Sequence, residues 1–302
     1  MRAITVRDRE SGIDGLSLAE LPYPHAAEND VVVRVHAAGF TRGELTWPGT
    51  WTDRAGRDRS PSVPGHEVSG VVADLGYGTT GFTVGQRVFG LTDWLRDGTL
   101  AEYVAVEARN LAALPASVAH VTAAAVPISG LTAWQDLFDH ANLQRGQTVM
   151  IHGIAGAVGS VAAQLAQEIG AHVIGTGRTA DATRAAELGA HDFVDLAGDD
   201  LEKAGQVDVV LDVIGGEIRY RSGLLLRPGG TLVTIADPPT QQPPNARAVF
   251  FVVEPNREQL THLATRLHDG RLKPLVTTVL PLDDAVSAFQ PARGRTIIKV
   301  TG

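Results

Sequence analysis

Cysteine is absent from all 302 residues of the chain. Its absence excludes disulfides, thiolate metal ligands, iron–sulfur clusters and cysteine nucleophiles, so a metal site would depend on His, Asp or Glu side chains. A dense basic run is also missing: 26 Lys and Arg residues stand against 34 Asp and Glu residues, which gives a net charge of −8. A chain without a basic stripe is poorly matched to a phosphate backbone, and we therefore expect no nucleic-acid partner.

Long apolar runs are absent as well. The opening residues, MRAITVRDRE, are rich in charge, and no later run approaches the length of a membrane span. We therefore expect a cytoplasmic protein that does not associate with membranes. The residue in excess is glycine, with 33 copies, which draws attention to tight turns and to places where a ligand approaches the backbone.

The chain is long enough for two hydrophobic cores, and its texture changes at about residue 120. Short apolar strands separated by glycine and proline predict a β module over residues 1–120. Residues 272–302 return to short extended pieces, so we expect them to rejoin that module. The strands expected in these two parts are 31–37, 68–72, 84–89, 100–106 and 296–300.

Residues 121–271 alternate between strands and helices. The apolar residues that follow residue 157 recur at helical spacing, so this helix should pack one face on a sheet. Alternation of this kind is typical of an α/β fold with a doubly wound parallel sheet. The strands expected here are 148–152, 171–176, 193–195, 207–213 and 231–235.

A glycine-rich segment, GIAGAVG, joins the first of these strands to that helix. A dinucleotide pyrophosphate needs free backbone N–H groups at a helix N-terminus and residues without Cβ beside it, and Gly156 and Gly159 suit those positions. Gly153 stands one place earlier than the usual G-x-G-x-x-G spacing requires, so the fingerprint is only partly met. The alternative is a glycine-rich turn without a ligand.

The following strand should end beside the adenosine ribose of such a cofactor. An NAD enzyme commonly offers an acidic side chain there, whereas this chain has Gly177 and then Arg178. Glycine leaves room for a 2′-phosphate and the guanidinium can pair with it, which favours NADPH. The alternative is that Arg178 is a solvated loop charge.

Several motifs in register resemble one family across nearly the whole chain. They are GHEVSGVV (65–72), PISGLTAW (127–134), GQTVMIHGIAGAVGSVAAQLA (146–166), DVVLDVIGG (208–216), LRPGGTLV (226–233) and GRTIIKV (294–300). This set is similar to the medium-chain dehydrogenase/reductases and, more narrowly, to their zinc-free, NADPH-dependent quinone oxidoreductase branch. The resemblance implies a GroES-like β domain, a Rossmann domain, a cofactor cleft between them and commonly a homodimer.

The resemblance also bears on metal binding. At the positions that hold the catalytic zinc in the family's alcohol dehydrogenases, this chain has Thr41, His66 and Ile128, which cannot form a tetrahedral zinc site. The segment 92–99, TDWLRDGT, is too short for the structural zinc lobe. We therefore expect no metal. Without a Lewis acid, the accessible reaction is hydride delivery from NADPH to a quinone or an α,β-unsaturated carbonyl.

Two residues are candidates for catalysis. Thr41 could donate its hydroxyl hydrogen to the acceptor oxygen, or it could simply finish a strand. His66 could donate a proton or a hydrogen bond, but a histidine at this position could equally serve to tie its ring to a neighbour. Thr132 could contact the nicotinamide side, or it could act as a helix N-cap.

The resemblance implies a further set of cofactor contacts. The pyrophosphate would lie against Gly156, Ala157 and Val158, and the adenosine end against Thr176, Gly177 and Arg178. The loops at Ile214 and Ile235 would face the nicotinamide ring. Phe250 or Phe251 would lie by its amide. The apolar run around these phenylalanines could instead, or in addition, form a sheet edge covered by a twofold partner.

The substrate is less well defined by the sequence. Where the quinone reductases often carry tyrosines, this chain has Trp47 and Trp51, which could stack on a conjugated acceptor or pack against the β module and leave Arg54, Arg57 and Arg59 solvated. Three functions therefore stay open: a quinone reductase, an enone or enoyl-thioester reductase, and an NADPH-binding regulatory protein without turnover.

Overall fold

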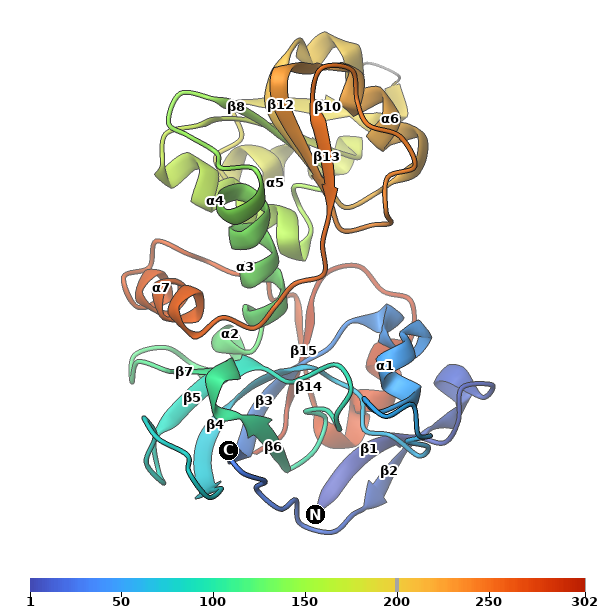
Figure 1. Cartoon of the computed structure of the whole chain (residues 1–302), viewed down its shortest axis with the longest axis vertical. Coiled ribbons are helices and arrows are strands. Elements are labelled where there is room, and N and C mark those ends of the chain that lie inside the picture. The colour runs from blue at the N-terminus through green and yellow to red at the C-terminus, as the bar shows by residue number, and fades with distance from the viewer. Residues whose placement is uncertain (199–200, 302) are drawn as a thin grey trace. The chain divides into compact units, whose positions relative to one another are not determined.

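The computed structural model describes residues 1–198 and 201–301 (Figure 1). Asp199, Asp200 and Gly302, which fall inside the expected domain ranges, lie outside the described residues. The chain forms two compact units. Unit 1 consists of residues 1–128, 255–270 and 274–302, and unit 2 consists of residues 129–254 and 271–273.

The units differ from the expected ranges in three places. Residues 272–273, expected to rejoin the β module, belong to unit 2. Residues 121–128 and 255–270 belong to unit 1 rather than to the second domain. The first of these segments contains most of helix α2 (His120–Ala123), and the second contains helix α7 (Arg257–His268). Helix α7 has a regular N-cap, because the Asn256 side chain accepts a hydrogen bond of 3.1 Å from the Gln259 N–H, and it buries Leu260 and Leu263 in its unit.

Unit 1 is built on strand β3, which pairs antiparallel with β4, β6 and β15. Its larger sheet has the order β14-β15-β3-β4-β5-β7, and β1 and β2 form a separate hairpin. The strands are β1 (Arg2–Val6), β2 (Leu16–Glu20), β3 (Asp30–Gly39), β4 (Glu67–Leu75), β5 (Arg87–Leu91), β6 (Tyr103–Glu107), β7 (Leu111–Ala113), β14 (Thr278–Pro281) and β15 (Thr296–Lys299). The end of the chain therefore pairs directly with β3.

Short helices connect these strands. The α-helices are α1 (Pro48–Trp51), α2 (His120–Ala123) and α7 (Arg257–His268), and α3 (Pro127–Trp134) leads from unit 1 into unit 2. The 3-10 helices are η1 (Gly12–Gly15), η2 (Arg42–Thr46), η3 (Ala108–Asn110) and η8 (Leu282–Phe289). The valines of β3 at positions 31, 33 and 35 share one core with Leu282 and Phe289 of η8. This core holds the C-terminal segment on the sheet.

Unit 2 contains a parallel sheet in the order β10-β9-β8-β11-β12-β13. Its strands are β8 (Thr148–Ile151), β9 (His172–Gly177), β10 (Asp192–Asp195), β11 (Val207–Asp212), β12 (Leu226–Thr234) and β13 (Arg247–Phe250). The strand order reverses between β8 and β11, so the sheet is doubly wound. In such sheets ligands bind outside the carboxyl ends of the strands at this reversal.

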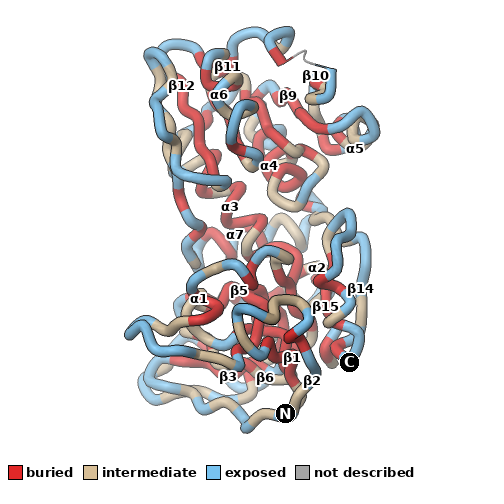
Figure 2. The backbone as a smooth tube through the Cα atoms, turned by 90° about the vertical axis from the view of Figure 1, so that its right-hand side faces the viewer, coloured by how far each residue is buried: buried red, intermediate tan, exposed pale blue. Residues whose placement is uncertain are grey.

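Helices accompany the sheet of unit 2. They are α4 (Ala157–Glu168), α5 (Ala182–Glu187), α6 (Gly216–Leu224), the π-helix η4 (Gln135–His140) and the 3-10 helices η5 (Thr179–Asp181), η6 (Leu196–Gly198) and η7 (Leu201–Ala204). Helix α4 packs on β8 and β9 through the apolar face expected from its spacing. Figure 2 shows this helix and the central strands largely as buried backbone. Within residues 1–198 and 201–301, no helix combines the length and apolarity that crossing a bilayer requires.

The α/β class and the parallel sheet are confirmed. The expected strands are present, with ends that differ by a few residues; β12, for example, begins at Leu226 rather than at residue 231. Strands β1, β2, β7 and β14 were not expected as strands, because each has only three to five residues and is defined by its pairing with another strand.

Candidate functional site

The glycine loop of unit 2 has the geometry of a phosphate cradle. Gly153 follows β8 with φ +61°, a conformation that favours glycine. Gly156 is the N-cap of α4. A Cβ on Gly159 would lie 2.4 Å from the Gly153 carbonyl oxygen and 2.7 Å from Ile154 Cα, so only glycine lets helix and loop pack this closely. The shifted first glycine therefore still provides the tight turn.

The start of helix α4 supplies the donors. The N–H groups of Ala157 and Val158 lie in the first turn, where no carbonyl four residues earlier in the helix is available, and the helix dipole places positive charge there. Donors at a positive helix end, beside residues without Cβ, fit a dinucleotide pyrophosphate.

A buried histidine ties three elements together behind this loop. The ring nitrogens of His152 lie 2.8 Å from Thr176 Oγ1 and 2.7 Å from Ser222 Oγ. Ser222 donates its own hydroxyl to the Ile218 carbonyl, so its oxygen accepts from His152 Nε2–H and Thr176 donates to Nδ1. Burial lowers the pKa of His152 to about 4, so this ring is neutral at neutral pH. The Thr176 hydroxyl is thereby used within the protein.

Asp212 fixes the two loops that were expected to face the nicotinamide ring. Its carboxylate accepts from the N–H groups of Ile214 and Gly215, both at 2.9 Å, and from the Thr234 hydroxyl at 2.7 Å. Its backbone carbonyl accepts from the Ile235 N–H at 3.0 Å. One buried residue therefore positions both of the loops expected to face the cofactor ring, through its side chain and its backbone carbonyl.

The strand end that was expected to lie beside the adenosine contains an acidic residue that the sequence pattern did not reveal. Gly177 is buried at the end of β9, and Arg178 is exposed. However, the Asp181 carboxylate accepts from the Arg178 N–H at 3.0 Å and would lie 3.1 Å from a Cβ on Gly177. The turn of η5 returns this carboxylate to the strand end, a contact that linear spacing did not indicate.

The remaining expected cofactor residues lie in different environments. Phe250 ends the edge strand β13 and is 37% exposed, whereas Phe251 is buried with its ring 4.5 Å from that of His140. Thr132 is buried inside α3, which begins at Pro127. The N-cap alternative for Thr132 is therefore wrong, because the helix starts five residues earlier.

Asp136 is a buried carboxyl that the sequence analysis did not single out. It lies in the π-helix η4, is fully buried, and neither carboxyl oxygen has a hydrogen-bond partner. Burial, and the charge of nearby Asp212, raise the pKa of Asp136 well above its ordinary range. Burial therefore favours the protonated, neutral form of Asp136.

In unit 1, the Glu44 carboxylate, which the sequence analysis did not single out, accepts hydrogen bonds from the segments that carry the two catalytic candidates. Thr41 caps η2, and its N–H donates to the Glu44 carboxylate at 3.4 Å. The other Glu44 oxygen accepts from the Gly65 N–H at 2.7 Å. Glu44 is fully buried, and burial raises its pKa to about 8. Glu44 thus connects the segment that carries Thr41 with the one that carries His66.

His66 lies among aromatic rings. Its Nδ1 is 3.0 Å from Thr92 Oγ1, and its ring stacks on Trp47 with centroids 5.8 Å apart and an interplanar angle of 20°. Trp94 meets the same imidazole edge-on at 4.9 Å. Burial lowers the pKa of His66 to about 3, so the ring is neutral at neutral pH and does not carry an acidic imidazolium proton.

At the positions that hold zinc in the family's alcohol dehydrogenases, hydrogen bonds and an ion pair connect residues of this chain to one another. The Ile128 N–H donates to the Glu67 carboxylate at 2.9 Å, and Glu67 also pairs with buried Arg295. Arg295 in turn donates to the Phe40 carbonyl at 2.8 Å. Among residues 1–198 and 201–301, no three His, Cys, Asp or Glu side chains are grouped so that they could hold a metal ion.

The two tryptophans of the 45–60 loop behave differently. Trp51 is buried and donates its indole N–H to the Leu45 carbonyl at 2.9 Å, so it packs into the β unit. Trp47 is partly exposed and belongs to the aromatic group at His66. The loop arginines are paired with Asp93 (Arg54), Asp53 (Arg57) and Asp97 (Arg59).

A β unit with this network, followed by a doubly wound unit with a phosphate cradle, defines a nicotinamide-dependent oxidoreductase. Residues 27–116 match the family model of the alcohol dehydrogenase GroES-like domain, and residues 188–297 match that of a zinc-binding dehydrogenase. The chain is 31% identical to a 2-methylene-furan-3-one reductase of Solanum lycopersicum, over 96% of this chain and 75% of the relative.

Two further proteins are similar over nearly their full lengths. A probable zinc-binding oxidoreductase, mitochondrial, of Arthroderma benhamiae is 29% identical over 92% of this chain and 91% of the relative. The structure of the quinone oxidoreductase from Coxiella burnetii superposes with a TM-score of 0.90 at 26% identity, over 100% of this chain and 99% of that one. The chain belongs to the medium-chain dehydrogenase/reductase superfamily, in its quinone oxidoreductase-like branch.

Proposed function

We propose that this oxidoreductase is zinc-independent, uses NADPH, and reduces a quinone or another conjugated carbonyl. The observation that carries the proposal is the set of residues at the family's zinc positions. Thr41 is an alcohol, His66 is a neutral ring bound through Nδ1 to Thr92, and Ile128 offers an alkyl group. These residues suit a hydrogen-bonding surface better than a metal site.

NADPH, when bound, supplies a hydride. The acceptor must then tolerate a developing negative charge without a Lewis acid, which a quinone or an enone does by delocalising the charge onto oxygen. Thr41 is a partly exposed residue, and its hydroxyl could donate a hydrogen bond to that oxygen. Because His66 is neutral, we assign it a role in shaping the site with Trp47, and water supplies the proton that completes the reduction.

The preference for NADPH rests on the end of β9. Exposed Arg178 can pair with a 2′-phosphate, and Gly177 adds no side chain there. Asp181 opposes this preference, because its carboxylate lies beside the same strand end. We propose that Arg178 outweighs Asp181, whose charge is already engaged by a backbone N–H.

We also propose a homodimer formed through β13. This strand is the last in the parallel sheet, and the residues around its end, Phe250 and Val252, are 37% and 60% exposed. An apolar sheet edge of this kind is covered in a twofold pair when two copies place their strands side by side.

A second candidate activity is reduction of a conjugated carbon–carbon double bond. The name of the tomato relative, 2-methylene-furan-3-one reductase, describes an alkene conjugated to a ketone. Purified protein should be mixed with NADPH and either a quinone or a short alkenal, and the products identified. Hydroquinone supports the first activity and the saturated aldehyde supports the second.

The same assay tests zinc independence and catalysis. Rates that survive extensive treatment with a chelator, in protein with less than one zinc per ten chains by elemental analysis, support the proposal. A rate that falls with the metal content contradicts zinc independence. Tight NADPH binding without turnover of either acceptor would instead favour a regulatory protein.

A further inference from the structure

Trp94 completes an aromatic corner that the sequence did not indicate. Its ring lies 5.2 Å from Trp47 at an interplanar angle of 87°, and 4.9 Å from His66 at 67°. Trp47 and His66 are nearly parallel to each other. Two indole planes at right angles offer one flat face and one ring edge, and both indoles are partly exposed. Flat conjugated molecules pack favourably in such an arrangement.

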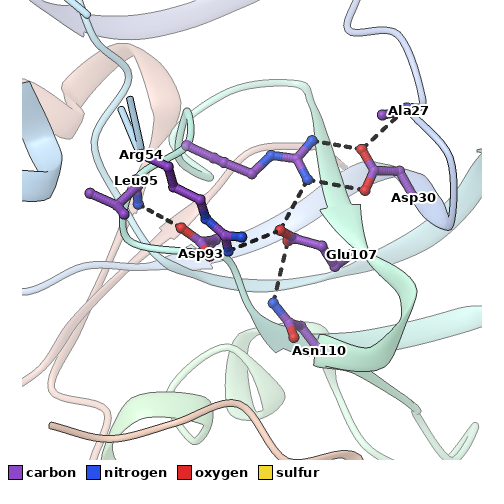
Figure 3. Close-up of polar contacts among 8 residues, drawn as sticks. Ala27, Asp30, Arg54, Asp93, Leu95, Glu107 and Asn110 are labelled. Atoms are coloured by element: carbon purple, nitrogen blue, oxygen red, sulfur yellow. Dashed lines mark hydrogen bonds and ion pairs between the residues drawn. The ribbon is translucent and has the colours of Figure 1, made fainter. Parts of the chain in front are cut away.

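The segment that carries Trp94 has no regular secondary structure, and ion pairs hold it on both sides. Asp93, immediately before Trp94, pairs with Arg54. Two residues after Trp94, Arg96 donates to both carboxylate oxygens of Asp30, at 3.0 and 2.6 Å. Figure 3 shows Asp30, Arg54, Asp93 and Glu107 gathered in one place, and the Arg96 guanidinium lies 3.3 Å from the Glu107 carboxylate.

The Arg96–Asp30 pair is suited to fixing a position. Asp30 stands at the start of β3 and is 1% exposed, so one member of the pair belongs to the rigid sheet. Its carboxylate also accepts from the Ala27 N–H at 3.2 Å. A bidentate contact defines both distance and orientation, whereas exposed ion pairs in general add little to stability.

The Trp47 segment is packed directly onto the Trp94 segment. A Cβ on Gly49 would lie 2.4 Å from the Trp94 carbonyl oxygen, so the backbone of α1 approaches the Trp94 backbone as closely as glycine allows. Asp93 reinforces the local turn by accepting from the Leu95 N–H at 2.8 Å. The two indoles are therefore held by a single packed arrangement, rather than by two independent loops.

We propose that Trp94 is a specificity-determining residue that selects flat, conjugated ring acceptors, and that Arg96 and Asp30 are positioning residues that hold it. This inference rests on the proposed function and narrows its substrate class from conjugated carbonyls to planar rings, such as naphthoquinones. Trp94 would contact the acceptor, whereas Arg96 and Asp30 would act through Trp94.

The test compares a naphthoquinone with a short aliphatic alkenal in Trp94→Leu and Trp94→Phe variants. Loss of one aromatic contact should raise KM for the naphthoquinone about tenfold in Trp94→Leu and by less in Trp94→Phe. The KM for the alkenal and kcat for both acceptors should change by less than about twofold. Equal changes in KM for both acceptors would overturn the specificity role.

The positioning role is tested with Asp30→Asn, and Arg57→Gln serves as the matched control. The control removes the exposed ion pair between Arg57 and Asp53, which both lie in the 45–60 loop that carries Trp47. It does not alter Asp93 or Leu95, the residues on either side of Trp94. Asp30→Asn should raise KM for the naphthoquinone severalfold and shift the Trp94 indole N–H signal in an NMR spectrum, and Arg57→Gln should do neither. An unchanged Trp94 signal and unchanged KM in Asp30→Asn would overturn this role.

Binding separates a failure of this inference from a failure of the proposed function. Direct binding of the naphthoquinone is measured without NADPH, by equilibrium dialysis, in native protein and in Trp94→Leu. Weaker binding in the variant supports the role of Trp94 even if the protein turns over neither acceptor. Equal binding in the two proteins contradicts it, whatever the activity proves to be.

Discussion

Glu44 accepts a hydrogen bond of 2.7 Å from the backbone N–H of Gly65, the residue that precedes His66. The same carboxylate holds the N–H of Thr41, so the two catalytic candidates share one buried acid. Glu44 and Gly65 are 21 residues apart in the sequence. The local shape of the site therefore depends on the protonation and size of the Glu44 side chain.

Glu44 should make stability depend on pH. Because burial raises its pKa from 4.5 to about 8, the folded protein keeps a proton that the unfolded chain loses. Its contribution is therefore full below pH 4.5 and is lost as the pH rises through 8. Glu44→Gln should flatten the fall in thermal unfolding midpoint over this range. A variant whose midpoint falls as steeply as that of the native protein would contradict this assignment.

Asp136 should impose a second pH dependence of the same sign. Its folded pKa is raised, so the stability it contributes is present at low pH and is lost as the pH rises above the ordinary range of an aspartate. Asp136→Asn removes the charge at nearly constant volume and should stabilise the protein at pH 8 by about 1–3 kcal/mol. At pH 4 the variant and the native protein should unfold at similar temperatures. Calorimetry at both pH values checks this expectation.

Gly159→Ala should damage the phosphate cradle. The added Cβ meets backbone atoms that cannot rotate away, the Gly153 oxygen and Ile154 Cα, so the helix or the loop must move. We expect a loss of about 1–3 kcal/mol in stability and at least tenfold weaker NADPH binding. Gly43→Ala is the control, since its Cβ would meet no atom within 4 Å. Tight NADPH binding by a folded Gly159→Ala protein would show that the glycine loop is not part of the cofactor site.

Arg178 and Asp181 should shift cofactor preference in opposite directions. Arg178→Ala should weaken NADPH binding about tenfold and leave NADH binding nearly unchanged, because only NADPH carries the 2′-phosphate. Asp181→Asn should strengthen NADPH binding severalfold by removing a repelling charge. Titration of each variant with both cofactors measures these changes. Equal loss of both cofactors in Arg178→Ala would remove the argument for a 2′-phosphate contact.

Val252→Glu should disrupt the proposed dimer. The residue is 60% exposed and follows the edge strand, so a charge there would be forced into an apolar contact between two copies. Sedimentation analysis should show a dimer for the native protein and a shift toward monomer for the variant. Val84→Glu, at a 63% exposed position in unit 1, is the matched control and should leave the native state of association unchanged. A native protein that is monomeric at all concentrations would end the proposal.

Local patterns in the sequence were sufficient to predict the α/β framework of unit 2. The glycine spacing between β8 and α4, the apolar face of α4 and the alternation of strands with helices depend on residues a few positions apart, so each is visible in a short window. The resemblance of several motifs to those of the medium-chain dehydrogenase/reductases indicated the family. The position of the first glycine, although shifted, still allowed the turn because Gly153 adopts a positive φ.

Some expectations depended on an element boundary that a short window defines poorly. Thr132 was a plausible N-cap only if α3 began beside it, and the helix begins at Pro127 instead. Trp51 was a plausible ring for stacking, but its indole N–H binds the Leu45 carbonyl in the core. The side chain of a loop residue can turn toward either side, and packing decides between them.

The sequence by itself determined that the chain would build a parallel sheet with a glycine cradle and would carry only one zinc-binding side chain, His66, at the family's three positions. Only the tertiary structure placed Trp94 against His66, Asp181 beside Gly177, and Asp136 in a buried site without a hydrogen bond. The reason is physical. Periodicity and turn chemistry act between neighbours in the chain, whereas the burial, pKa and orientation of a side chain depend on atoms brought to it by folding.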